Sequence, residues 1–173
     1  GAPVSGYFAR PQRANPRSLP AILMVHGAGV RSAGLAFTRW ATEQGGMLAM
    51  EINAHGIPNG REPAFYKQLA DTTLLRYSTS GRGDREKNYF VGVFLRLLRA
   101  IDFLAVQPEW DGRTLIVYGT SQGGYQALAA AGLDARVSFI CAGVPSGCDH
   151  TGMVVNRISG HPKLVTVANG KPV

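Results

Sequence analysis

Apolar runs of strand length alternate with amphipathic segments of helix length along most of the chain. The runs expected to form strands are VSGYFAR (4–10), AILMVH (21–26), MLAMEIN (47–53), TLIVYG (114–119) and RVSFICAG (136–143). AILMVH is apolar at nearly every position, which is typical of a strand that is buried on both faces. One more short strand is expected within residues 161–170.

Segments of helix length separate these strands. Residues 88–110 give the clearest helix, because their large apolar side chains recur at steps of three and four residues. These side chains belong to Phe90, Phe94, Leu97, Leu98, Ile101 and Leu104. A helix at 122–132 should be closed by Gly132, and one at 33–45 by Gly45. The latter offers one apolar face made of Leu35, Phe37, Trp40 and Ala41.

Residues 54–87 interrupt the alternation. They are expected to contain a short helix around 64–76 and then a loop rich in Ser, Gly and Arg. An excursion of this length usually carries a function or an interface. The whole pattern predicts one α/β domain over residues 1–173, with a mostly parallel sheet covered by helices on both faces. Reactive groups in such sheets gather at the carboxyl ends of the strands.

A serine framed by glycines lies at one of those ends. Gly119-Thr120-Ser121-Gln122-Gly123 follows an apolar strand and opens an Ala-rich helix, which matches the G-x-S-x-G nucleophile elbow. A sharp turn there would expose the Ser121 hydroxyl and strain the serine backbone, so that the neighbouring side chains must be small. The alternative is a turn of a nucleotide-binding domain. The stretch lacks the Lys of a phosphate loop and follows several strands, which disfavours that alternative.

Two backbone N–H groups are candidates for stabilising an oxyanion. The Gln122 N–H lies at the start of the helix after Ser121, where the helix dipole favours negative charge. MVHGAGV (24–30) places His-Gly at the end of an earlier strand, where such folds supply a second donor, and the Ala28 N–H is the candidate. His26 is interpreted as bracing this loop, although a role as catalytic base is the alternative.

Composition narrows the classes of partner. The net charge of +7 comes from 18 Lys and Arg against 11 Asp and Glu, and only Arg10, Arg13 and Arg17 cluster loosely. A nucleic-acid binder usually gathers its charge on one face, so we expect no nucleic-acid partner.

No apolar run is long enough for a transmembrane helix, so we expect no membrane association. The first residues lack the layout of a signal peptide, and localisation stays open between secreted or periplasmic and cytoplasmic.

The two cysteines are too few for a disulfide framework. Cys141 lies in an apolar run and is expected to be a buried small residue, while a local bridge to Cys148 remains open in an oxidising compartment. No Cys/His spacing resembles a zinc site, so no metal is expected.

Residues 88–137 resemble the acetyl xylan esterase/cephalosporin-C deacetylase family of carbohydrate esterases. The shared features are a Tyr-rich entry to a long helix, Pro-Glu-Trp-Asp-Gly before the strand, and Ser-Gln-Gly-Gly at the elbow. His-Gly-Ala-Gly at 26–29 occupies the place of the family's His-Gly oxyanion loop, and the resemblance extends over roughly residues 4–170. This chain differs from the family at Asn53-Ala54-His55-Gly56, where family members often carry Arg-Gly-x-Gly. The resemblance therefore does not define the local structure of the acyl pocket.

The resemblance implies an α/β-hydrolase fold, Ser121 as nucleophile, and the N–H groups of Gln122 and Ala28 as oxyanion hole. It further implies no metal or cofactor, acetyl esters on sugars as substrates, and a ring-shaped homo-oligomer that encloses its active sites.

The base and acid of a triad are harder to find in the chain. In this fold they follow the serine in the order Ser, then Asp or Glu, then His. Downstream of Ser121 the carboxylates are Asp134 and Asp149, and the histidines are His150 and His161. Asp134 follows the elbow helix too closely, and the adjacent Asp149 and His150 should point apart. A triad assembled from Asp149 with His150 or His161 is the less favoured alternative. We therefore expect the acid and base beyond residue 173, so that the C-terminal strands of the fold are missing and this chain alone is inactive.

Three explanations for the missing partners stay open: a companion chain after cleavage, a truncated product, or a degenerate hydrolase that binds without reacting. The leading hypothesis is a serine esterase that removes acetyl groups from xylan or xylo-oligosaccharides. The alternatives are another α/β-hydrolase, such as a short-chain esterase or a peptidase-like enzyme, and a non-catalytic remnant.

Overall fold

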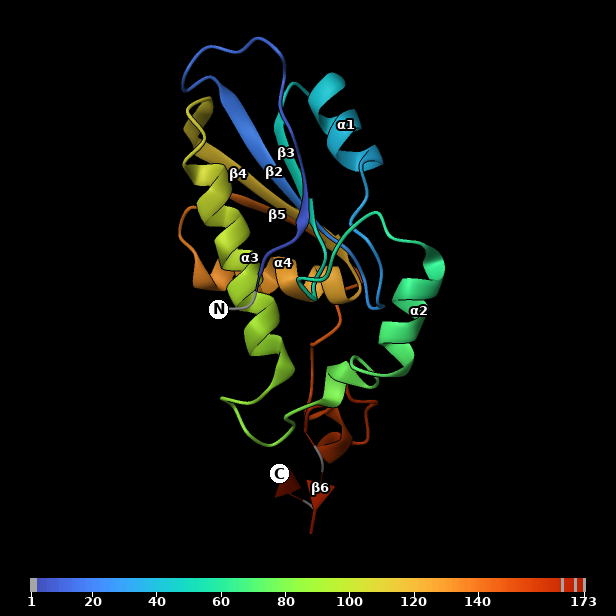
Figure 1. Ribbon diagram of the computed structural model, residues 1–173. Helices are drawn as coiled ribbons and strands as arrows, with labels where there is room; N and C mark the ends of the chain where they lie inside the picture. The colour runs from blue at the N-terminus through green and yellow to red at the C-terminus, as the bar shows by residue number, and fades with distance from the viewer. Residues whose placement is uncertain (1–2, 166, 170, 173) are drawn as a thin grey trace.

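A five-stranded sheet forms the centre of the computed structural model, which describes residues 3–165, 167–169 and 171–172 (Figure 1). The strands are β1 (Gly6–Ala9), β2 (Leu19–Val25), β3 (Leu48–Ile52), β4 (Trp110–Thr120) and β5 (Phe139–Gly143). Their order is β1-β3-β2-β4-β5. Strands β2 to β5 run parallel, and β1 is antiparallel to β3. The mostly parallel sheet predicted from the apolar runs is confirmed.

Helices cover both faces of this sheet. Neighbouring side chains of β4 point to opposite faces: Val117 is fully buried in the core with α3 (Tyr89–Ala105), whereas the Tyr118 ring stacks on Phe37 of α1 (Ala36–Glu43) with centroids 5.7 Å apart. Figure 1 shows α1 on one side of the sheet and α3 on the other, with α4 (Gln122–Leu133) beside α3.

The apolar stripe of α3 supplies much of the core. Phe90, Leu97, Ile101 and Leu104 are buried as predicted, and the last three join one cluster with residues of the sheet and of α4. Phe94 and Leu98 are partly buried at its edge. Burial of a Leu or Ile side chain contributes about 1.5–3 kcal/mol to folding, so this stripe fixes α3 on the sheet.

Two helix predictions need correction. In α1 the buried residues are Thr38 and Ala41, while Leu35 is 49% and Trp40 60% exposed. The helix is only eight residues long and packs on the sheet through Thr38 and Ala41, which turns Trp40 toward solvent. Helix α4 continues past Gly132, which lies inside it, and ends where Asp134 adopts extended backbone angles.

The excursion at 54–87 contains α2 (Pro63–Asp71) and the 3-10 helix η1 (Tyr77–Thr79). Helix α2 therefore ends five residues before the predicted boundary, and turns fill the interval up to η1. No helix among the described residues is long and apolar enough to cross a membrane.

Strand β5 forms one edge of the sheet, and the chain beyond it leaves the sheet. Residues 144–165 contain the 3-10 helix η2 (Gly152–Val155), and β6 (Val167–Ala168) pairs with β7 (Lys171–Pro172) in a separate two-stranded sheet. The expected strand within 161–170 is thus β6. Cys141 was wrongly predicted to be buried: it lies on the uncovered edge strand, and both it and Cys148 are exposed free thiols.

Candidate active site

Ser121 joins β4 to α4 at the carboxyl edge of the sheet. Its backbone angles, φ 56° and ψ −118°, are seldom adopted by residues other than glycine. A Cβ atom on Gly119 would lie 2.5 Å from the carbonyl of Gly123, and one on Gly123 would overlap the Val25 carbonyl. The strained, glycine-flanked turn expected of a nucleophile elbow is therefore present.

The loop after β2 lies directly beside this turn. A Cβ atom on Gly27 would come within 3.6 Å of the Ser121 Cβ. His26 Nδ1 lies 2.9 Å from the Gly27 carbonyl oxygen, and Arg31 Nη2 donates to the same oxygen at 3.3 Å and to the Ala28 carbonyl at 2.7 Å. These contacts favour the interpretation that His26 braces the loop.

Fixing the Gly27 carbonyl also fixes the Ala28 N–H, because the two belong to one planar peptide and point in opposite directions. Within the part of the chain that the structure describes, the N–H groups of Ala28 and Gln122 have no hydrogen-bond partner, nor does the Ser121 hydroxyl. One exposed hydroxyl and two unused N–H groups thus lie at neighbouring loops, which is the equipment that acyl transfer requires.

Three residues that the sequence did not single out as candidates connect these loops. The Gly29 N–H donates to Tyr77 Oη at 3.1 Å, and the Tyr77 hydroxyl donates to Gln122 Oε1 at 2.8 Å. His55 lies 3.2 Å from the Gly29 carbonyl through Nε2 and 2.7 Å from Tyr89 Oη through Nδ1. The sequence indicated only that the long excursion at 54–87, which contains Tyr77, should carry a function or an interface.

Burial controls the charge of the two histidines in these loops. Desolvation lowers the pKa of His55 to about 4, and it also lowers the pKa of His26. Both imidazoles are therefore neutral near pH 7. The Nε2 of His26 is buried without a partner among the described residues.

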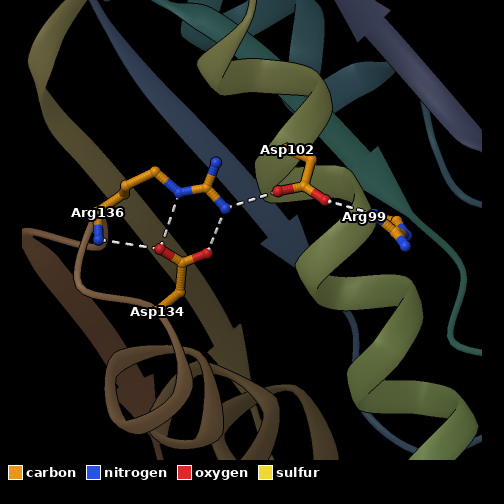
Figure 2. Close-up of polar contacts among 4 residues, drawn as sticks. All are labelled: Arg99, Asp102, Asp134 and Arg136. Atoms are coloured by element: carbon orange, nitrogen blue, oxygen red, sulfur yellow. Dashed lines mark hydrogen bonds and ion pairs between the residues drawn. The ribbon is translucent and has the colours of Figure 1, made fainter.

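The carboxylates and histidines after Ser121 are not assembled into a triad. Asp134 forms a bidentate ion pair with Arg136, which also contacts Asp102 at 2.7 Å (Figure 2). Asp149 pairs with Arg157 at 3.0 Å rather than with its neighbour His150. Both ring nitrogens of His150 are buried without a hydrogen-bond partner in the described residues.

His161 completes this group of candidates. His161 is an exposed residue, and its carbonyl oxygen accepts a hydrogen bond from the Gly147 N–H. Among residues 3–165, 167–169 and 171–172, therefore, no described hydrogen bond or ion pair connects the Ser121 side chain to a histidine or carboxylate.

This chain is similar to known proteins in sequence and in structure. Acetyl esterase Axe7A of Xylanibacter ruminicola is 32% identical over 170 residues, which are 96% of this chain and 38% of that protein. An acetyl xylan esterase from Paenibacillus sp. R4 has a TM-score of 0.72 and 30% identity, covering 92% of this chain and 50% of its own. Acetyl xylan esterase 1 from Thermoanaerobacterium sp. has a TM-score of 0.68 at 20% identity, with coverage of 88% and 46%.

The chain spans half or less of the length of these relatives. Their structures confirm the α/β-hydrolase fold for the part that is matched. The family model of acetyl xylan esterases (AXE1) matches residues 1–163. The chain therefore belongs to the acetyl xylan esterase family.

Proposed function

We propose that this chain carries the nucleophile and the oxyanion hole of a serine esterase that removes acetyl groups from acetylated carbohydrates. The observation that carries the proposal is the strained turn at Ser121 with the unused N–H groups of Ala28 and Gln122 beside it. Membership of the acetyl xylan esterase family supports the substrate class, and the sugar chain we propose is xylan or its oligosaccharides.

The reaction follows from these groups. The Ser121 Oγ attacks the acetyl carbonyl carbon while a base takes the hydroxyl proton, and the carbonyl oxygen becomes an oxyanion. The N–H groups of Ala28 and Gln122 donate to that oxygen; loss of one such donor typically lowers kcat by about 100- to 1,000-fold. The sugar hydroxyl leaves with the proton, and water then releases acetate from the acetyl-Ser121 ester.

We place the acid and the base in polypeptide outside these 173 residues. The engagement of Asp134 with Arg136, and of Asp149 with Arg157, supports this placement. So does the uncovered edge of the sheet, where Phe139 is 63% and Val144 84% exposed, since an unpaired strand edge is a surface for further pairing. The partner is thus proposed to be a companion chain with the remaining strands, and assembly into a homo-oligomer is proposed from the family resemblance.

The test uses the protein with any companion polypeptide retained, whose presence is read from the intact mass of the purified material. Wild-type protein should release acetate from acetylated xylo-oligosaccharides, and Ser121→Ala should lose this activity by at least about 1,000-fold. Ser80→Ala is the matched control, because Ser80 is exposed and lies outside the oxyanion loop and the elbow. Equal activity of wild type and Ser121→Ala would reject the proposal.

A series of acyl lengths tests the substrate class. The rate should fall steeply from acetyl to butyryl and longer esters on the same alcohol. A flat profile would instead favour a general esterase, and cleavage of acyl-peptides would favour a peptidase-like enzyme.

A further inference from the structure

A continuous path of hydrogen bonds runs from the first residue of α3 to the first residue of α4. It passes through Tyr89, His55, Gly29, Tyr77 and Gln122, with donor–acceptor distances of 2.7, 3.2, 3.1 and 2.8 Å. The path joins four segments: the loop after β2, the excursion at 54–87, the start of α3, and the elbow helix.

The direction of every link can be assigned. The Gly29 carbonyl only accepts, so His55 Nε2 must carry the proton of the neutral imidazole, and Nδ1 must accept from the Tyr89 hydroxyl. The Gly29 N–H only donates, so Tyr77 Oη accepts there and uses its own proton toward Gln122 Oε1. His55, Gly29 and Tyr77 thus each donate once and accept once, while the Tyr89 hydroxyl at one end only donates and Gln122 Oε1 at the other only accepts. Burial raises the pKa of Tyr89 and keeps its phenol protonated, which agrees with this direction.

Both ends of the Tyr77 link lie next to a candidate oxyanion donor. Gly29 directly follows Ala28 and has φ +125°, an angle that other residues rarely adopt. Gln122 carries the second N–H itself, and its side chain is fully buried. The Tyr77 hydroxyl therefore hydrogen-bonds to the oxyanion loop on one side and to the elbow on the other. The Gln126 side-chain amide makes a second link, with longer bonds to the carbonyl oxygens of His26 at 3.5 Å and Gln122 at 3.4 Å.

We propose that Tyr77 is a positioning residue, whose hydroxyl sets the separation and orientation of the Ala28 and Gln122 N–H groups. The proposal rests on the esterase function above, because a donor spacing matters only where an oxyanion forms. Misplacement of a reacting group by about 1 Å costs on the order of 100-fold in rate. Loss of this one link should therefore act on kcat more than on substrate binding.

Packing of the Tyr77 ring is a separate contribution. The ring lies 4.5 Å from that of His55 and 5.2 Å from that of Tyr89, measured between centroids. Tyr77→Phe keeps these contacts and removes the hydroxyl alone, so it isolates the proposed role from the packing.

The matched control is Tyr66→Phe. Tyr66 lies in the same excursion and is buried, and its hydroxyl also bonds on two sides, to the Pro58 carbonyl and the Arg61 N–H. Neither partner belongs to the oxyanion loop or the elbow. The two variants lose the same atom from similar environments.

The experiment measures kcat and KM for acetate release, and the rate at which a fluorophosphonate labels Ser121, in the protein with any companion chain present. For Tyr77→Phe we expect kcat and the labelling rate to fall about 10- to 100-fold with KM within about threefold of wild type. Tyr66→Phe should keep kcat within about threefold, even where its melting temperature falls as much as that of Tyr77→Phe.

The outcomes separate the two proposals. Wild type that is labelled at Ser121 but releases no acetate contradicts the substrate class, and the labelling rates of the two variants then still decide the role of Tyr77. A Tyr77→Phe variant with the kcat and labelling rate of Tyr66→Phe, or with a change in KM alone, overturns the positioning role. Absence of both labelling and acetate release in wild type overturns both proposals.

Discussion

The two ends of helix α4 are held in place by opposite kinds of interaction. At its N-terminal end, Gly123 packs against the β2 backbone, and the buried Gln122 side chain belongs to a partly buried path of neutral hydrogen bonds. At its C-terminal end, Gly132 has open space around it. Asp134, next to that end, is attached to α3 through the ion pairs of Arg136 and Asp102 (Figure 2).

This difference follows from what each end does. Groups that must meet a reacting atom need fixed positions, and close packing with neutral hydrogen bonds in a buried site provides them. Half-exposed ion pairs leave their side chains free to rearrange and are screened by salt. We therefore expect substitutions at the N-terminal end to cost more stability and more activity than those at the C-terminal end.

The largest effect is expected from Gly123→Ala. The added Cβ would overlap the Val25 carbonyl, which is part of the central sheet and cannot move away without disturbing β2. The free energy of unfolding should fall by at least about 3 kcal/mol, as measured by urea denaturation.

Gly132→Ala is the matched control, nine residues away in sequence and near the other end of the same helix. Among the described residues, no atom outside the neighbouring turns of the helix lies within 4 Å of the added Cβ there, so alanine should stabilise the helix by about 0.5–1 kcal/mol. Equal effects of the two substitutions would contradict the comparison between the ends.

An acid titration tests the neutral path at the N-terminal end. Folded His55 takes up a proton only near pH 4, whereas the unfolded residue does so near pH 6.5. The unfolded state therefore binds the proton first as the pH falls. The free energy of unfolding should decrease by about 3 kcal/mol between about pH 6.5 and pH 4 on account of this residue.

His55→Gln isolates the contribution of His55, since the amide can donate and accept in the same directions without titrating. Folding also lowers the pKa of His26, so this residue decreases the free energy of unfolding in acid in both wild type and His55→Gln. The difference between wild type and His55→Gln across this pH range is thus the quantity to measure. Parallel stability curves for the two proteins would refute the assignment of a neutral, buried His55.

The elements around the site could be predicted from local patterns. Apolar runs located all five strands of the sheet, and the spacing of Leu97, Ile101 and Leu104 defined the buried face of α3. The turn at Ser121 was also predictable, because its geometry depends on the residues directly before and after it. Local sequence is sufficient where local geometry decides the outcome.

Other features depend on what lies next to a segment in space. The pattern around Cys141 resembles a buried strand, yet β5 is an edge strand and Cys141 is exposed. Trp40 belongs to an amphipathic helix but lies off the face that the sheet covers. The bond between Tyr77 and Gln122 joins residues 45 positions apart, and periodicity carries no information on such a contact.

Of the substitutions near the two ends of α4 that destabilise the protein, Arg136→Ala should have the smallest effect. The hydrogen bonds of the guanidinium lower the pKa of Asp134, but the Arg136 side chain is 40% exposed. The free energy of unfolding should fall by only about 0.5–1 kcal/mol, and this loss should shrink near 1 M salt, where the Debye length is about 3 Å.

Arg39→Ala is the control, since Arg39 and Glu43 form a pair with side chains 69% and 58% exposed, and its effect should be smaller still. A loss at Arg136 that is as large as that of Gly123→Ala, and insensitive to salt, would show that ionic contacts position this helix as firmly as packing does.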